Sequence, residues 1–171
     1  IRKSQPMRDW DFLFEAAGPG STYVFSPTAH SALVEVINRL DYSRIGVHDW
    51  YVYALARAIG LTWVIGEEPT LEYRQHGGNV QGANSGAGAR DARMEKLRNG
   101  FYRNQFILTA RAAQQVGAFD APRRIELAQI LRELEADSQW ARLRFALRYR
   151  QIRRDRLEGI KLAAARFLRV W

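Results

Sequence analysis

From Trp50 to Ile59, apolar side chains follow one another around most of the circumference of a helix. A helix of this kind must be covered on most of its sides, so the pattern predicts a buried element rather than a surface helix. We expect it to begin near His48-Asp49 and to end at Gly60, where a left-handed C-cap residue is typical. We expect a sheet to cover this helix.

A second helix is predicted before it. Ser26 suits the N-cap position, and Pro27 suits the first helical position, where its missing N–H costs nothing. Apolar residues then recur at helical spacing on one face: Ala29, Ala32, Leu33, Val36, Ile37 and Leu40. This face predicts packing against another element.

Three short segments favour extended structure. Residues 21–25 are β-prone, and residues 61–65 and 71–73 suggest two strands around the turn at 67–69. Because such short strands need a larger sheet, the sequence predicts an α/β fold for residues 1–88, completed by strands outside the chain. An incomplete sheet exposes an edge, so a homo-oligomer is also expected.

Residues 89–171 are predicted to form a helical C-terminal region. Helices are expected at 90–117 and 125–136, followed by an arginine-rich stretch at 139–171. That stretch holds ten Arg or Lys against Asp155 and Glu158, a net charge of +8 that equals the excess of the whole chain. The other 138 residues are therefore neutral, and the basic balance belongs to this tail alone.

The basic tail admits three interpretations: a solvated helix, a membrane-surface helix or a nucleic-acid arm. Apolar residues are interleaved with its cations, which favours an interfacial helix near anionic lipid and hence a peripheral membrane protein. No recognised nucleic-acid reading motif is present, so no nucleic-acid partner is expected. The chain has no Cys, which fits a reducing, cytoplasmic setting at the inner face of the membrane.

Two motifs resemble a known enzyme family. Residues 47–83, VHDWYVYALARAIGLTWVIGEEPTLEYRQHGGNVQGA, are similar to the region after the acceptor site in family 2 inverting glycosyltransferases, notably rhamnosyltransferase-like members. Residues 18–26, GPGSTYVFS, are similar to the glycine-rich stretch before the acceptor-side helix of the same enzymes. The resemblance covers roughly residues 16–84 and implies the C-terminal portion of a GT-A (Rossmann-like) catalytic domain. Because the chain opens on Ile1 without a signal-type segment, we expect a longer enzyme.

The resemblance gives Asp49 the role of catalytic base. Inverting sugar transfer needs a carboxylate that takes the proton of the acceptor hydroxyl as that hydroxyl attacks the anomeric carbon. The residue pattern alone leaves a structural alternative open, because Asp at a helix start also caps backbone N–H groups.

Three residues of the loop at 74–88 are candidates for binding the donor diphosphate. A guanidinium such as that of Arg74 matches phosphate oxygens with two parallel bonds, and Asn79 is a weaker candidate of the same kind. The resemblance makes His76 a ligand of a divalent cation, Mg²⁺ or Mn²⁺. The resemblance places its remaining protein ligand in an Asp-x-Asp motif of the preceding nucleotide-binding half, outside this chain. Each of the three also has a structural alternative as an ordinary loop residue.

The acceptor side is predicted from three further residues. Gly18 and Gly20 would let backbone approach a substrate closely, although a tight turn explains both equally well. Trp50 would stack on a sugar ring, and its alternative is a place in the core.

Together, these residues predict part of an inverting glycosyltransferase for cell-surface polysaccharide synthesis. It would move a deoxyhexose such as rhamnose from a nucleoside-diphosphate donor to a glycan or lipid-linked acceptor. The chain alone is expected to be inactive. The rival hypothesis is a non-catalytic membrane-docking or interaction module.

Overall fold

The computed structural model describes residues 3–68 and 87–171, and these residues form helices connected by loops. Two short 3₁₀ helices come first, η1 (Asp11–Leu13) and η2 (Gly20–Thr22). The α-helices follow: α1 (Pro27–Ile37), α2 (His48–Ala58), α3 (Ala87–Arg98), α4 (Phe101–Val116), α5 (Ala121–Glu135), α6 (Gln139–Leu147) and α7 (Arg156–Phe167). No strand occurs in the described residues.

The predicted α/β fold is therefore wrong. Residues 61–65 do alternate between more and less exposed side chains, as the pattern suggested, with Thr62 and Val64 facing solvent. Their inward side chain Trp63 packs on Tyr23 and Tyr53 and not on a sheet. A strand needs a neighbouring strand for its backbone groups, and the described part of the chain supplies none. Residues 71–73 lie outside the described residues.

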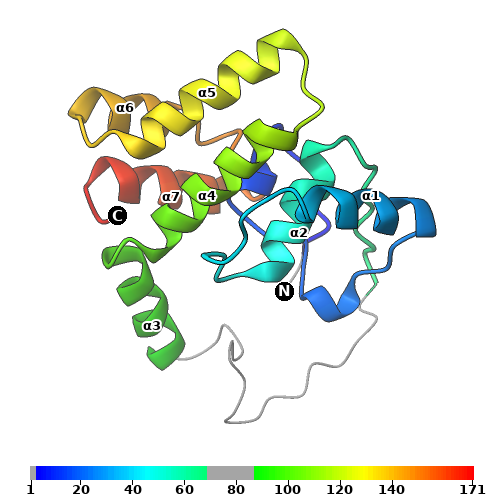
Figure 1. Cartoon of the computed structure of the whole chain (residues 1–171). Coiled ribbons are helices and arrows are strands. Elements are labelled where there is room, and N and C mark those ends of the chain that lie inside the picture. Colours follow the sequence, from blue (N-terminus) through cyan, green and yellow to red (C-terminus); the bar gives the residue numbers. More distant parts are fainter. Residues whose placement is uncertain (1–2, 69–86) are drawn as a thin grey trace.

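Helix α4 runs through the middle of the molecule (Figure 1). On one side it packs against α2, which in turn contacts α1, and on the other side it packs against α5. Helices α5, α6 and α7 follow one another along that second side. Predicted helix 90–117 is divided into α3 and α4 at Gly100, whose φ of 77° is left-handed.

The predicted boundaries of α1 and α2 are confirmed by their caps. The Ser26 side chain accepts a hydrogen bond from the Ala29 N–H at 3.2 Å, and Pro27 begins α1. Gly60 follows α2 with a φ of 82°. The apolar face of α1 packs with α2 in a shared cluster that includes Leu33 and Leu55. Helix α2 is buried as predicted, but helices cover it instead of a sheet.

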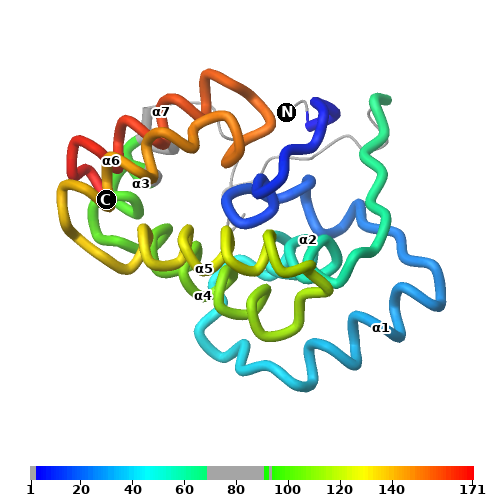
Figure 2. Tube along the Cα trace, turned by 90° about the horizontal axis from the view of Figure 1, so that it is seen from above, coloured from blue at the N-terminus to red at the C-terminus, as the bar shows by residue number. Residues whose placement is uncertain are grey.

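The main core is built around the N-terminal segment. Trp10, Phe12 and Phe14 are at most 1% exposed and pack with residues of α2, α4, α5, α6 and α7. Figure 2 shows this dark blue segment between α2 and the orange C-terminal turn, and the Trp10 N–H donates to the Gln151 carbonyl at 3.2 Å. Residues on both sides of position 88 share this core. The division of domains at that position remains a prediction.

The basic tail consists of two helices, and half of its cations are turned inward. Arg154 lies within 3.4 Å of Asp11 and 3.3 Å of Glu15 and is buried. Arg166 is also buried and donates to the carbonyls of Ala136 and Trp171. Three further arginines are buried or partly buried: Arg142, Arg148 and Arg153. Much of the positive charge of the basic tail therefore holds the fold together.

Candidate functional site

Asp49 lies in the first turn of α2 and is held by the glycine-rich turn that precedes α1. Its Oδ2 atom accepts a hydrogen bond from the Gly20 backbone N–H at 3.0 Å. The N-cap residue of α2 is Val47, and no side chain caps the helix there. N-capping is therefore not what Asp49 does, although a carboxylate in the first turn still favours the helix dipole.

The other carboxylate oxygen of Asp49 faces a second polar group. Its Oδ1 atom lies 3.3 Å from Nε2 of His48, whose side chain is 89% exposed. The Asp49 side chain itself is 26% exposed. One oxygen is thus fixed by backbone, while the carboxylate remains within reach of solvent and of a small polar molecule.

Gly20 lies tightly against Asp49, whereas Gly18 has ordinary space around it. A Cβ atom at Gly20 would lie 3.1 Å from the Asp49 Cβ and 3.3 Å from its Cγ. At Gly18 the nearest atom would be Thr22 Oγ1 at an ordinary 3.7 Å. The two glycines of one turn therefore differ in function: Gly20 permits a close approach to the candidate base.

Tyr23 supports the same turn through its hydroxyl group and its ring. Its hydroxyl donates to the Gly18 carbonyl at 3.0 Å, and its ring packs against Trp63 with centroids 4.8 Å apart. Burial raises the pKa of Tyr23 from 10 to about 12, with a smaller contribution from the negative charge of Asp49 and against the opposing effect of the Gly18 hydrogen bond. The phenol therefore stays protonated and keeps its bond to the turn.

The loop before α2 is anchored from α4. The Gln105 side chain accepts from the Gly46 N–H at 2.9 Å and donates to the Arg44 carbonyl at 3.1 Å. A Cβ at Gly46 would meet the Phe101 ring at 2.8 Å, so a larger residue there would have to displace that ring. Gln105 and Tyr23 thus position the site, and sequence reasoning missed both. Tyr23 lies within the quoted glycine-rich motif, whereas no local pattern marks Gln105.

Trp50 belongs to the core. It is 5% exposed, its Nε1–H donates to the Phe12 carbonyl at 2.8 Å, and its ring packs edge-on against Phe106. Trp50 therefore has the place in the core that was the alternative to sugar binding, and no sugar can stack on it in this position.

The predicted donor-side residues Arg74, His76 and Asn79 lie outside the described residues, so their roles remain predictions. The described ranges 3–68 and 87–171 contain no group of three His, Cys, Asp or Glu side chains that could hold a metal ion. In the described part of the chain, Asp49 has His48 and Tyr23 as its titratable neighbours and no second carboxylate in a metal-binding group. The divalent cation expected to bind His76 and a ligand outside this chain remains a prediction.

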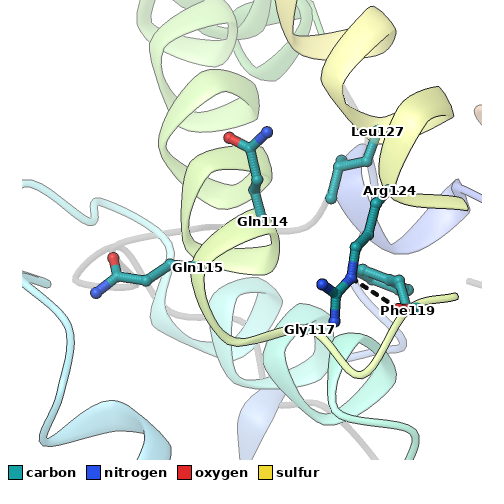
Figure 3. A pocket seen from close by; sticks show the side chains of 6 residues that line it. All are labelled: Gln114, Gln115, Gly117, Phe119, Arg124 and Leu127. Carbon is teal, nitrogen blue, oxygen red and sulfur yellow. Dashed lines mark hydrogen bonds between the residues drawn. The ribbon is translucent and has the colours of Figure 1, made fainter. Parts of the chain in front are cut away.

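A shallow pocket of about 230 Å³ lies at the far end of α2 from Asp49. It is lined by residues of α4, the following loop and α5: Gln114, Gln115, Gly117, Phe119, Arg124 and Leu127 (Figure 3). The Arg124 guanidinium is tied to its wall, because its Nε donates to the Phe119 carbonyl at 2.8 Å. The adjoining loop bonds to Ala58 at the C-terminus of α2, one helix length from Asp49. This pocket is not part of the candidate site.

Comparison with known proteins gives one informative match. No family model matches the chain, and no solved structure matches it. Among curated proteins, the dTDP-rhamnosyl transferase RfbG of Shigella flexneri is 38% identical over 117 residues, which make up 66% of this chain and 39% of that protein. This chain is similar to a rhamnosyltransferase. The resemblance to rhamnosyltransferase-like glycosyltransferases is thereby confirmed, while assignment to family 2 and to the GT-A type remains a prediction.

The similarity has a limited extent. The chain spans about two fifths of the length of the curated relative. The relative's name describes a transferase of which this chain matches only a part. Its activity, donor and acceptor are therefore proposals for this chain.

Proposed function

We propose that this chain is the acceptor-side part of an inverting glycosyltransferase that moves rhamnose or a related deoxyhexose onto a glycan or lipid-linked acceptor. The observation that carries the proposal is the Asp49 carboxylate, fixed at Oδ2 by the Gly20 N–H, in a chain similar to a dTDP-rhamnosyl transferase. The donor class follows from that name, and the setting in cell-surface polysaccharide synthesis is part of the proposal.

The chemistry needs little from Asp49 beyond position and charge. The acceptor hydroxyl oxygen attacks the anomeric carbon, its proton passes to the Asp49 carboxylate, and the bond between that carbon and the diphosphate breaks on the opposite face. Oδ1 suits proton transfer better than Oδ2, because Oδ2 already accepts the Gly20 hydrogen bond. His48 stands beside Oδ1 and gives the acceptor a second polar contact.

The donor side of the proposal rests on the loop residues. Arg74 and Asn79 would bind the leaving diphosphate, and His76 would ligate a divalent cation that neutralises its charge. A separate nucleotide-binding part is required in this scheme, so the 171-residue chain should not turn over a donor alone.

The first test is Asp49→Asn in a longer polypeptide that contains this chain. Asparagine keeps the size and the Gly20 contact but cannot accept a proton, so transfer from dTDP-rhamnose should fall by about 100-fold or more. The rate of transfer is measured by the release of dTDP and by the incorporation of sugar into the acceptor. Glu35→Gln on exposed α1 is the matched control. Wild-type transfer by Asp49→Asn would exclude Asp49 as the base, and turnover by the isolated chain would contradict the need for a second part.

A membrane-docking role is the second candidate, and a specific observation favours it: α7 carries exposed apolar side chains. The same Asp49→Asn variant separates the two functions. If the variant loses transfer but keeps membrane association, the catalytic role is supported. If the chain only docks on the membrane, the variant would change neither transfer nor membrane association.

A further inference from the structure

Helix α7 exposes an apolar stripe although its opposite face is packed in the core. Gly159, Leu162, Ala163 and Arg166 form the inward face and are buried. The outward face carries four large apolar side chains with substantial exposed fractions: Leu157 at 66%, Ile160 at 41%, Phe167 at 42% and Leu168 at 69%. Figure 1 shows α7, in red, at one end of the helical array beside α6.

The outward residues share one side of the helix. At about 100° per residue, positions 157, 160, 164, 167 and 168 fall within one arc of about 100°. Position 164 is an exposed alanine, so no polar residue interrupts this stripe. A contiguous apolar face of this kind on a protein surface marks an interaction site more often than chance exposure does.

Cations border the stripe on both sides. By the same spacing, Arg156 lies along one edge and Lys161 along the other, and both are exposed. Lys161 pairs with Glu158 at 2.8 Å. Glu158 lies farther around the helix from the apolar stripe than Lys161 does. Arg169 adds an exposed cation just beyond the C-terminal end of α7, where it pairs with Asp137 at 3.4 Å.

This arrangement distinguishes between the surfaces that could cover the stripe. A contact with another protein would leave the bordering charges in its solvated rim, where they contribute little. A second copy of this chain would bring the same cationic borders together. An anionic lipid surface takes the apolar side chains below the headgroups while the bordering cations reach the phosphates.

We propose that the outward face of α7 docks on an anionic lipid bilayer, with the helix lying parallel to its surface. No helix of the described residues could cross a membrane, so the contact is interfacial. The helix is already formed and fixed: Arg166 donates to the Ala136 carbonyl at 2.6 Å and to the Trp171 carbonyl at 3.0 Å. Docking therefore requires no folding of the tail, and it presents the fold to a lipid-borne molecule. The inference does not depend on the catalytic role of Asp49.

The test is flotation of the protein with vesicles of phosphatidylethanolamine and phosphatidylglycerol, compared with phosphatidylcholine alone. The triple variant Leu157→Ser, Ile160→Ser, Phe167→Ser should bind the anionic vesicles at least about tenfold more weakly. The charge variant Arg156→Gln, Lys161→Gln should lose about fivefold per cation. The exposed Ile125→Ser on α5 is the control and should bind as wild type does.

Each other outcome would overturn the proposal. Equal flotation of the triple variant and wild type would show that α7 is not the contact. Flotation on phosphatidylcholine to the same extent would remove the role of the cations. If wild type fails to bind vesicles and the triple variant dissociates an oligomer, the stripe is an interface between copies. If a longer polypeptide containing this chain does not float while the chain does, the added part covers the stripe. Circular dichroism of every variant establishes that the helices persist.

Discussion

Gly20 and Gly18 stand two residues apart, yet only one of them touches the candidate base. Gly20→Ala would force the Asp49 side chain away by a few tenths of an ångström, because its new methyl group would lie 3.1 Å from the Asp49 Cβ. Displacement of a catalytic group on this scale lowers rates strongly. We expect about a tenfold to 100-fold loss of kcat/KM in the longer enzyme, measured by dTDP release.

Gly18→Ala is the matched control for that experiment. Its Cβ has ordinary space, so activity should stay close to wild type. Equal losses in both variants would mean that the turn as a whole matters and that the Gly20–Asp49 contact does not.

Two residues that short motifs singled out lie together in the structure, while their roles stay predictions. Asp49 and Gly20 lie in the two quoted motifs, and the structure brings them into contact across 29 positions. Trp50 illustrates the limit, since a motif shows that a residue matters but not which way its side chain points. Gln105 lies 59 positions from Gly46 and acts through two backbone hydrogen bonds. Because every residue type offers a backbone carbonyl, and nearly every type an N–H, the sequence does not show that Gln105 has these partners.

At the scale of elements, the contact between α4 and the loop before α2 is testable. Gln105→Ala would leave the Gly46 N–H and the Arg44 carbonyl without their partner in a partly buried place. We expect a loss of about 1–3 kcal/mol in the free energy of unfolding. Urea unfolding measures it, with exposed Gln114→Ala on the same helix as the control. An unchanged urea midpoint would show that water replaces the amide.

Helices could be predicted here because their signals are local. Ser26 with Pro27 fixes the start of α1, and Gly60 fixes the end of α2. The expected strand at 61–65 depends on a non-local partner, and alternation alone does not supply one. Trp63 satisfies that alternation by packing on Tyr23 and Tyr53, so the same pattern fits a loop over an aromatic cluster.

At the scale of the whole molecule, a buried ion cluster joins the two ends of the described chain. Glu15 pairs with Lys3 at 2.9 Å and with Arg154 at 3.3 Å, and its Oε1 accepts from the Arg154 N–H. Burial alone would raise the pKa of Glu15. The charges of Lys3, Arg153 and Arg154 and the hydrogen bond from the Arg154 backbone N–H outweigh burial and lower that pKa from 4.5 to about 2.

This lowered pKa predicts a specific pH dependence. Glu15 stabilises the fold above its unfolded pKa of 4.5, and the contribution is lost as the pH falls toward about 2. Glu15→Gln should lower the free energy of unfolding at pH 7 by roughly 2 kcal/mol and flatten its decline at acidic pH. Urea unfolding across this pH range measures both. Glu35→Gln, on an exposed side chain, should leave the profile unchanged; identical profiles for Glu15→Gln and wild type would contradict the prediction.

The burial of Trp10, Phe12 and Phe14 among residues from the far end of the chain has a consequence during synthesis. These side chains are made before Phe145, Ile152 and Trp171, which belong to the same core. On the ribosome the early aromatics therefore remain uncovered until α7 has left the exit tunnel. Nascent chains with such exposed apolar segments aggregate readily, so we expect chaperones to hold this one until α7 emerges.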